Sequence, residues 1–379
     1  MAYVTLFDKN FNALGSSDKF VGTQHVTKSW SLKRRSFEFD DFTATCRGFR
    51  DSKNACFVGL YSDEGTLKYL CFCGIPKTEG ELTTITGIDC RNIFNQTLPV
   101  NLGSTKITNE KTLYEFLLKT AMGNLNIGID YEINTNGLSE ENWEDPANYI
   151  ERTLDSRNIW ELIQSANALD LRTDTQKGKD EDAYDRGNGE KVIDGRTVVV
   201  TWKVNEETNR YKLVFRVLKY INVGTSIKLS DYNVKTTRTN NITNIAIAST
   251  EDFTKSAMFY LTNDNEVVEA TGNDGIDGTK ALFPPKAETY TAATLDEAIT
   301  DAKNALYENR FKDRVTINCN SRLGKKLDSL ELNNYAKLVG YNPADDDSVK
   351  ILPVSAIEED STGNRKIEFG RLSEYWFLN

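Results

Sequence analysis

The sequence predicts a β-rich α+β protein made of two small β-barrel-like domains with accessory α/β domains. Most of the chain consists of short runs of β-branched and aromatic residues separated by turn residues, which is typical of small barrels or sandwiches. A helical period of apolar residues appears in only three places. At roughly 150 residues per domain, a chain of 379 residues corresponds to two or three domains.

Residues 1–105 are predicted to form the first β-barrel-like domain. Its opening hairpin joins residues 3–7 to residues 11–14, because Asp8, Lys9 and Asn10 between them favour a turn. Further strands, rich in β-branched and aromatic residues, are expected at 37–45, 56–61, 67–75 and 82–88.

Residues 106–190 are predicted to form a helical α/β domain. The first helix is expected to stop at Gly123, and the second to have Asp155 or Ser156 as its N-cap. Their apolar stripes are Leu113, Phe116, Leu117 and Ala121 in the first helix, and Ile159, Leu162, Ile163 and Ala166 in the second. The stretch 128–148 is polar and turn-rich, and 173–194 is expected to be an exposed loop.

The second β-barrel-like domain is predicted from two pieces, residues 191–250 and 311–379, with residues 251–310 inserted as an α/β segment. Strands are expected at 197–204, 211–220, 226–229, 242–248, 258–262, 314–319, 350–357 and 365–372. The inserted segment contains the clearest helix, because Thr294 and Glu297 fit a capping box. One face of that helix is apolar, with Leu295, Ala298, Ile299, Ala302, Ala305 and Leu306.

The charge and the histidine count exclude several classes of function. The net charge of −10 lacks the positive field that proteins use to follow phosphate backbones, so generic nucleic-acid binding is disfavoured. The single histidine, His25, excludes a two-histidine metal site or a histidine proton relay within one chain. It lies in a polar segment without a companion signature, so we interpret it as an ordinary strand or loop residue.

The cysteines and the hydropathy favour a protein made in the cytoplasm, without a membrane anchor. The N-terminus has no basic start and no long apolar core, and no stretch approaches the ~18 apolar residues of a membrane-spanning helix. Cys71 and Cys73 suggest a metal or redox site, but they alternate with Phe72 on one strand and no CxxC partners them. We therefore interpret Cys46, Cys56, Cys71, Cys73, Cys90 and Cys319 as reduced thiols, packed mainly in the core.

The residues do not identify a catalytic or metal site, and they leave the binding residues unknown. GxSxG, GxGxxG and the Walker P-loop are absent, and the SxxK pattern at Ser16 and Lys19 falls in a turn. Asp274, Asp277 and the run 345–347 are interpreted as solvated loop acids, with weak calcium binding left open and no other cofactor expected. Paired carboxylates, as in glycoside hydrolases, stay an alternative because the chain has 56 acidic residues.

Two short clusters of basic and of apolar residues stand out. The basic triplet Lys33, Arg34 and Arg35 is an isolated feature of an acidic chain, so we expect a solvated strand end or an ion-pairing interface. The large apolar residues Tyr375, Trp376, Phe377 and Leu378 are expected to be buried in their own domain or against a neighbouring subunit.

Several motifs occur in an order that resembles the siphophage tail-tip hub proteins, also called tail-associated lysin or Tal proteins. The opening LFDKNFNALG at 6–15 is similar to the first hairpin of that family. LTTITGID at 82–89, followed by Arg91, Asn92, Ile93 and Phe94, resembles its strand–Gly–x–Asp step near the end of the first domain. NITNIAIA at 241–248 and IEFG at 367–370 are similar to its second β domain.

The resemblance implies a non-enzymatic structural protein of a bacteriophage tail tip. Members of the family share a fold with the central hub of contractile-phage baseplates and of type VI spikes. Three chains with two β-barrel domains each form a pseudo-hexameric ring below the distal tail ring protein, where the ring closes or extends the tail channel. Many members carry a lytic C-terminal extension, whereas this chain ends at Asn379, so no lytic activity is expected.

The resemblance also implies partners and a location. We expect a homotrimer at the virion tail tip, assembled in the host cytoplasm, that contacts the distal tail ring protein and possible tape-measure and receptor-binding proteins during host adsorption and DNA ejection. A charge of 3 × −10 = −30 per trimer would help DNA to pass without specific binding, if the acids face the lumen. The alternatives are a secreted or surface carbohydrate-active enzyme and the hub of a contractile tail or injection machine.

Overall fold

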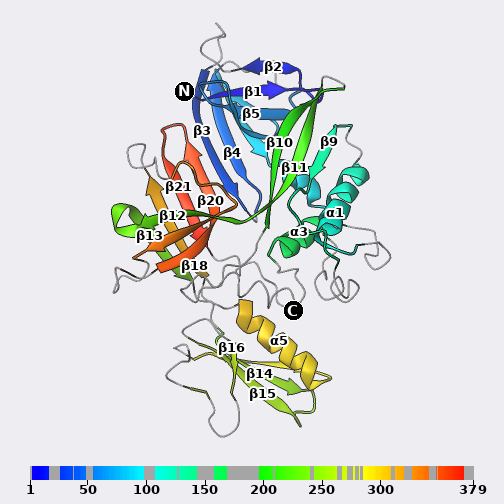
Figure 1. The fold of residues 1–379 in the computed structure, drawn as a ribbon, viewed down its shortest axis with the longest axis vertical. Coiled ribbons are helices and arrows are strands. Elements are labelled where there is room, and N and C mark those ends of the chain that lie inside the picture. Colours follow the sequence, from blue (N-terminus) through cyan, green and yellow to red (C-terminus); the bar gives the residue numbers. More distant parts are fainter. Residues whose placement is uncertain are drawn as a thin grey trace. The chain divides into compact units, whose positions relative to one another are not determined.

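A computed structural model gives two compact units. Unit 1 contains residues 1–235 and 316–369, and unit 2 contains residues 236–315 and 370–379. The structure describes residues 2–16, 26–36, 38–47, 54–97, 107–125, 128–142, 158–168, 196–207, 210–239, 243–262, 267–270, 276–277, 281, 285–308, 312–319, 327–340, 347 and 349–370. The fold is β-rich α+β and has several parts, as the sequence predicts (Figure 1).

The N-terminal strands of unit 1 form one end of a large sheet. They are β1 (Tyr3–Phe7), β2 (Ala13–Ser16), β3 (Val26–Arg35), β4 (Asp41–Arg47), β5 (Phe57–Tyr61), β6 (Leu67–Cys73), β7 (Lys77–Glu79) and β8 (Leu82–Ile88). Neighbouring strands follow the order β3-β4-β8-β6-β5-β1-β2, with β7 beside β8. The predicted opening hairpin is confirmed: Asp8 Oδ1 accepts the amides of Asn10 and Asn12 and so fixes the turn between β1 and β2.

Strands from later in the chain continue this sheet. They are β12 (Ile221–Lys228), β13 (Asn233–Thr239), β18 (Lys312–Cys319), β19 (Asn334–Val339), β20 (Val349–Asp360) and β21 (Arg365–Gly370), with the short η4 (Leu229–Asp231) between the first two. The twelve-residue β20 joins the two halves, because residues 349–353 pair with β19 while residues 356–360 pair with β3. The described pairings form an open path and do not close either half into a ring.

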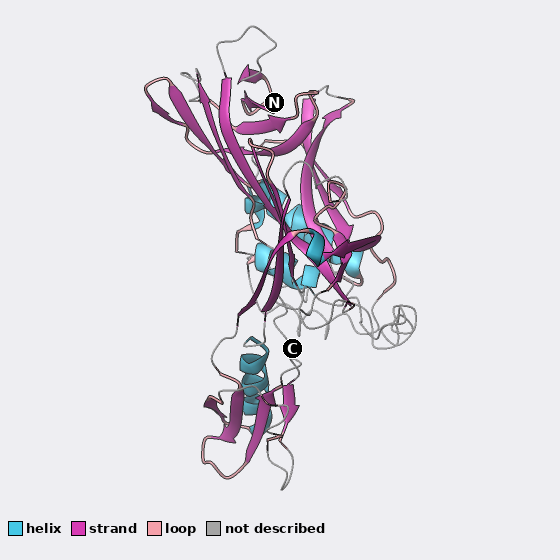
Figure 2. Ribbon diagram, turned by 90° about the vertical axis from the view of Figure 1, so that its left-hand side faces the viewer, coloured by secondary structure: helices cyan, strands magenta, loops and turns pink. Residues whose placement is uncertain are grey.

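Beside the large sheet, a further part of unit 1, called the third layer below, combines a small sheet with the helices. The sheet has the order β10 (Arg196–Asn205), β11 (Arg210–Lys219) and β9 (Tyr131–Asn134). The helices are η2 (Cys90–Phe94), α1 (Glu110–Leu125) and α3 (Ile159–Ala168), which lie close together among the long strands (Figure 2). Their shared core includes Phe94, Tyr114, Leu117, Ile163 and Phe215.

This layer differs from the expected grouping of residues 191–250 with the C-terminal strands. Strand β11 pairs with β10 on one side and with β9 on the other, and β9 lies in the stretch expected to be polar and turn-rich. The physical reason is the apolar face of β10 and β11, where Val198, Leu213 and Phe215 are buried against the helices.

The two helices of this layer occur where the sequence predicts them, with different ends. Helix α1 continues past Gly123 to Leu125, because the glycine is exposed and a single helical glycine costs only about 1 kcal/mol. The N-cap of α3 is Asn158, whose side-chain oxygen accepts the amides of Trp160 at 2.9 Å and Glu161 at 3.4 Å. The predicted caps Asp155 and Ser156 lie outside the described residues.

Unit 2 contains a four-stranded sheet with one helix packed on it. The strand order is β16 (Val267–Glu269), β15 (Ser256–Leu261), β14 (Ile245–Thr250) and β17 (Ala287–Ala292), and the helix is α5 (Leu295–Glu308). The capping box is confirmed, because Thr294 and Glu297 bond each other's backbone amides. Strand β14, expected in the second β domain, is a central strand here, since Ala246 and Ala248 pack against Ala298 and Ala302.

Candidate functional site: a buried ionic junction

The strand–Gly–x–Asp step at the end of β8 places two charged residues in the interior. Asp89 follows β8 and caps η2, with its Oδ1 accepting the backbone amide of Arg91 at 2.8 Å. The side chains of both residues are about 3% exposed. Gly87 is required for the close packing here, because an added Cβ would overlap Cys71 Sγ and lie 2.9 Å from Phe42 Cδ1.

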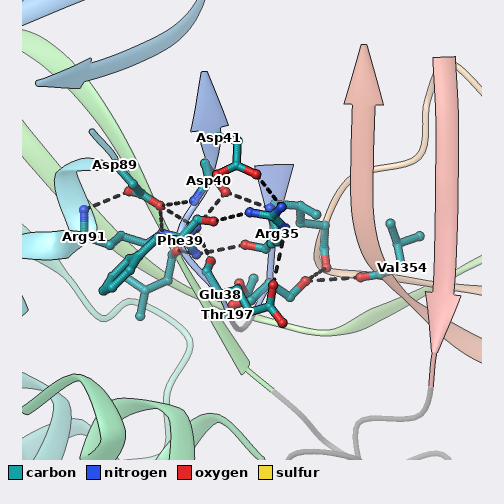
Figure 3. A network of polar contacts seen from close by, with 12 residues as sticks. Arg35, Glu38, Phe39, Asp40, Asp41, Asp89, Arg91, Thr197 and Val354 are labelled. Atoms are coloured by element: carbon teal, nitrogen blue, oxygen red, sulfur yellow. Dashed lines mark hydrogen bonds and ion pairs between the residues drawn. The ribbon is translucent and has the colours of Figure 1, made fainter. Parts of the chain in front are cut away.

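The guanidinium of Arg91 bridges two carboxylates. Its Nε donates to Asp89 Oδ2 at 2.8 Å, and its Nη2 donates to Asp40 Oδ1 at 2.7 Å. The backbone amide of Asp40 also donates to Asp89 Oδ2, at 2.8 Å. The carboxylates and the guanidinium therefore hold the turn between β3 and β4 against the beginning of η2 (Figure 3).

The remaining N–H groups of Arg91 donate to three backbone carbonyls, two near the end of β3 and one in β10. Nη1 reaches Arg35 O at 2.9 Å and Val198 O at 3.3 Å, and Nη2 reaches Glu38 O at 2.8 Å. Val198 belongs to β10, so the Arg91 side chain connects η2 both to the turn between β3 and β4 and to β10. The indole of Trp160 in α3 lies 5.5 Å from the guanidinium carbon and adds a cation–π contact.

A second polar cluster continues the junction to the C-terminal strands. Tyr220 Oη donates to Ser36 Oγ at 2.6 Å, and Ser36 Oγ lies 3.2 Å from the carbonyl oxygens of both Val354 and Leu332. Thr197 Oγ1 donates to Ser36 O at 3.3 Å. Ser36, the residue after β3, is thereby hydrogen-bonded to β10 and β20. The polar clusters around Arg91 and around Ser36 form one network (Figure 3).

Burial and charge shift the pKa values within the junction. Burial, together with the charge of Asp89, raises the pKa of Asp40 to about 7, although Arg91 opposes the shift. Burial alone would lower the pKa of the Arg91 guanidinium, but the charges of Asp40 and Asp89 outweigh this effect and raise the pKa. Asp40 is therefore the group of the junction that changes its protonation near neutral pH.

A cavity of about 90 Å³ lies beside the junction. Its lining residues are Arg34, Asp40, Lys68, Tyr69, Leu70, Asp89, Arg91, Val198, Val199, Val200 and Leu332. The Tyr69 hydroxyl oxygen is buried and has no hydrogen-bond partner among the described residues, and burial raises the pKa of this phenol. A polar cavity of this size is suited to ordered water, which would supply the hydroxyl with a partner.

The junction does not have the arrangement of a glycosidase site. Within the junction the carboxylates of Asp40 and Asp89 are brought together, but both bind the same guanidinium. Neither is placed on the opposite side of an open cleft, where the second carboxylate of a glycosidase is needed. Their arrangement serves to neutralise and position Arg91.

The basic triplet forms ion pairs within the chain. Lys33 pairs with Glu368 at 3.0 Å, and Arg34 with Glu331 at 3.3 Å. Arg35 pairs with Asp41 and, at 3.4 Å, with Glu38. These contacts connect β3 to β21 and to its own turn.

The other singled-out residues form no site within the described ranges. All six cysteines are free thiols, and Cys46, Cys71, Cys90 and Cys319 are buried. No group of three or more His, Cys, Asp or Glu side chains suited to a metal occurs among the described residues, where Asp277 and Asp347 are included. His25, Lys19, Asp274, residues 345–346 and the C-terminal Tyr375, Trp376, Phe377 and Leu378 lie outside them. None of the helices in the described part is long and apolar enough to span a membrane.

Comparison with known proteins identifies the fold. No protein-family model and no curated protein matches the chain. A chain in the structure of the phage P2 baseplate in its activated conformation with Ca matches with a TM-score of 0.53 and 12% identity, over 98% of this chain and 99% of that one. The 43 kDa tail protein of prophage MuSo2 from Shewanella oneidensis matches with a TM-score of 0.50 and 11% identity, over 99% of both chains.

The fold is thus one found in bacteriophage tail and baseplate proteins. At these identities the similarity concerns the fold alone, and it extends over essentially the whole of each chain. The coarser part of the resemblance seen in the sequence, to proteins of phage tails and baseplates, is therefore confirmed at the level of the fold.

Proposed function

We propose that this chain is a non-enzymatic structural component of a bacteriophage tail tip, and that three copies form the ring of the baseplate hub. The observation that carries the proposal is the fold match to the phage P2 baseplate chain, which spans 98% of this chain. The buried ionic junction suits such a role, because Arg91 and Ser36 connect the turn between β3 and β4 to β10 and to β20.

The finer assignment is to the siphophage tail-tip hub, or Tal, proteins. It is supported by the strand–Gly–x–Asp step, since Gly87 and Asp89 have specific packing and bonding roles at the junction. The expected partners are the distal tail ring protein, the tape-measure protein and receptor-binding proteins, and the expected location is the virion tail tip. The hub of a contractile tail has the same fold and differs in its partners.

The proposed ring closes or extends the tail channel during host attachment and DNA ejection. DNA would pass without specific binding, because the net charge of −10 per copy repels phosphates wherever acidic side chains face the lumen. Charge reversal of lumen-facing acids to lysine is expected to slow genome delivery, and unchanged delivery would contradict this part of the proposal.

The solution mass of the purified full chain tests the ring. We expect a mass of three chains (3 × 42.8 kDa) by analytical ultracentrifugation, and ring-shaped particles in negative-stain images. Adding the purified distal tail ring protein should give a larger complex. A chain that stays monomeric at all concentrations and ignores the ring protein would overturn the proposal.

A further inference from the structure

We propose that the cavity beside the junction is a binding site for a small oxyanion, of the size of sulfate or acetate. Its walls come from β3, β6, η2 and β10, and all of its lining residues belong to unit 1. Residues 68–70 of β6 line it, in the part of β6 that leaves β8, since the register that the structure describes pairs these strands only through Phe72 and Cys73. The departure of β6 from β8 keeps this space open.

The Tyr69 hydroxyl supplies the cavity with a buried hydrogen-bond donor. Its oxygen has no hydrogen-bond partner among the described residues. Burial and the charges of Asp40 and Asp89 raise the pKa of the phenol, so the hydroxyl keeps its proton and can donate it to a ligand. A buried hydroxyl without a partner is costly, because its hydrogen bonds to water are lost on folding. A bound hydrogen-bond acceptor would therefore be stabilised here.

Two cations at the cavity have N–H groups available for a ligand. Lys68 forms no ion pair within the described part of the chain, and its Nζ lies 6.0 Å from the centre of the Trp30 ring. Arg34 uses Nη1 for Glu331, whose side chain is 58% exposed, and its other guanidinium nitrogens have no partner in the ranges that the structure describes. Both side chains can therefore donate charge-assisted hydrogen bonds to an oxyanion.

Arg91 and Asp89 also line the cavity, but their hydrogen bonds are already made within the junction. The guanidinium of Arg91 donates to two carboxylates and three carbonyl oxygens. Both oxygens of Asp89 accept hydrogen bonds, from Arg91 and from the Asp40 amide. The groups left to a ligand are therefore Lys68, Arg34, the Tyr69 hydroxyl and the carboxyl group of Asp40, and most of them are donors.

Asp40 makes binding of an oxyanion depend on pH. Its Oδ1 accepts from the Arg35 amide and from Arg91, whereas its Oδ2 has no partner among the residues described. Because the pKa of Asp40 is about 7, the carboxyl is largely neutral at pH 6, where it can donate to an oxyanion. At pH 8 it is largely charged and repels one.

The neighbours of Asp40 do not titrate in this range. The groups that interact with it are Arg91, Asp89 and Cys90 at η2, Arg34 and Arg35 on β3, and Tyr69 and Cys71 on β6, while Lys68 lines the same cavity. Burial raises the pKa values of the phenol and of both thiols, so these groups stay neutral at pH 6 and at pH 8. The proton taken up with the oxyanion is therefore assigned to Asp40.

Titration calorimetry of the full chain with sulfate, and separately with acetate, tests the inference. Neither ion titrates between pH 6 and 8, and chloride keeps the ionic strength constant. We expect saturable binding at one site per chain, with a dissociation constant roughly tenfold lower at pH 6 than at pH 8. Asp40→Asn, whose amide can donate at either pH, should bind with little difference between them. Tighter binding of sulfate indicates a phosphate-like natural ligand, and tighter binding of acetate indicates a carboxylate.

Three further variants locate the site. Lys68→Gln removes a cation and is expected to weaken binding roughly tenfold, whereas Tyr69→Phe removes one neutral donor and should weaken it about threefold. Tyr69→Phe should not lower the melting temperature in chloride, because the hydroxyl has no described partner to lose. Lys77→Gln is the matched control, since Lys77 is an exposed lysine of β7 outside the cavity, and it should bind like the unmodified chain.

Weaker binding in Lys68→Gln and Tyr69→Phe, with Lys77→Gln unchanged, supports the inference. Equal binding in Lys68→Gln and Lys77→Gln would overturn it. So would the absence of saturable binding to the unmodified chain at both pH values, up to concentrations on the order of 100 mM, and the cavity would then hold water alone. The proposed function is tested separately by the mass of the oligomer, because every residue of this site belongs to one chain.

Discussion

Arg91 combines deep burial with a complete set of partners. The guanidinium binds two carboxylates and three carbonyl oxygens, so the cost of removing its charge from water is offset by charge-assisted hydrogen bonds. Without Arg91, two buried carboxylates would face each other with no cation between them. Loss of Arg91 is therefore expected to lower the stability more than loss of one partner of an exposed ion pair on the surface.

Replacement of Arg91 by alanine is expected to lower the free energy of unfolding of unit 1 by about 3–5 kcal/mol, because it leaves uncompensated buried charge. Arg47→Ala is the control: its pair with Glu81 is more than half exposed on both sides, so a loss below about 1 kcal/mol is expected. Guanidinium denaturation at pH 7, followed by tryptophan fluorescence, measures both. Equal losses in the two variants would contradict a special role for Arg91.

Asp40 makes the stability depend on pH. Its pKa of about 7 in the folded chain lies above its ordinary value of 3.8, so folding retains a proton that the unfolded chain releases between these values. The resulting stabilisation is complete below about pH 4 and is lost as the pH rises through 7.

We therefore expect the free energy of unfolding to fall between pH 5 and 7 by an Asp40 contribution on the order of 1 kcal/mol per pH unit. Asp40→Asn, which still accepts hydrogen bonds but does not titrate, should flatten this decrease. Asp41→Asn, with a 70% exposed side chain, should leave it unchanged. An Asp40→Asn variant with the same pH slope as the unmodified chain would refute the assignment.

Half of the junction is visible in the sequence, and half is not. Gly87, Asp89 and Arg91 lie within five residues, so their motif stands out as a strand end followed by a cap. Asp40 and Val198 are far away along the chain, and their approach depends on strand pairing that no local pattern reveals. Asp40 also precedes Asp41, an exposed acid, and sequence offers no reason to prefer one over the other.

Among the helices and strands, the sequence predicts those whose position depends on neighbouring residues in the chain. The opening hairpin, the α5 capping box and most strands follow from turn residues, caps and alternation. The sequence does not predict β3, because its inward residues Trp30 and Leu32 alternate with Ser and Lys, a pattern similar to a polar linker. Strand β9 was missed because its four residues pair in parallel with β11, some 80 residues further along the chain.

Two glycine substitutions distinguish a glycine that close packing requires from one that is only tolerated in a helix. Gly87→Ala is expected to destabilise unit 1 by about 1–3 kcal/mol, because its Cβ would meet Phe42 and Cys71 in the interior. Gly123→Ala should instead stabilise it by about 0.5–1 kcal/mol, because the exposed glycine in α1 has open space around it. Thermal unfolding of both variants measures the difference, and a shift of the same sign in both would contradict this interpretation.

For the whole molecule, the separate cores predict separate stabilities. Among the residues that the structure describes, the core of unit 2 contains Phe259, Leu261, Ala302 and Leu306 and no residue of unit 1, whereas Phe42 belongs to a core of unit 1. Local sequence patterns do not reveal these boundaries, since β14 has the same β-branched character as strands of unit 1.

Amide hydrogen exchange tests this division. Phe259→Ala is expected to lower the opening free energy of amides in α5 and β14 by about 3–5 kcal/mol and to leave β4 and β8 unchanged. Phe42→Ala should show the reverse pattern. Faster exchange in both units after either substitution would mean that they unfold as one.

The twelve residues of β20 also determine where the chain tolerates insertions. Because β20 pairs with β19 through its first part and with β3 through its second, one residue added between Val354 and Ala356 would move the side chains of one part to the opposite face. The turn after β20, where Gly363 adopts a φ of 83°, is exposed, so an added residue there does not change which side chains face the core. Homologous chains should therefore vary in length at this turn and keep a constant number of residues within β20.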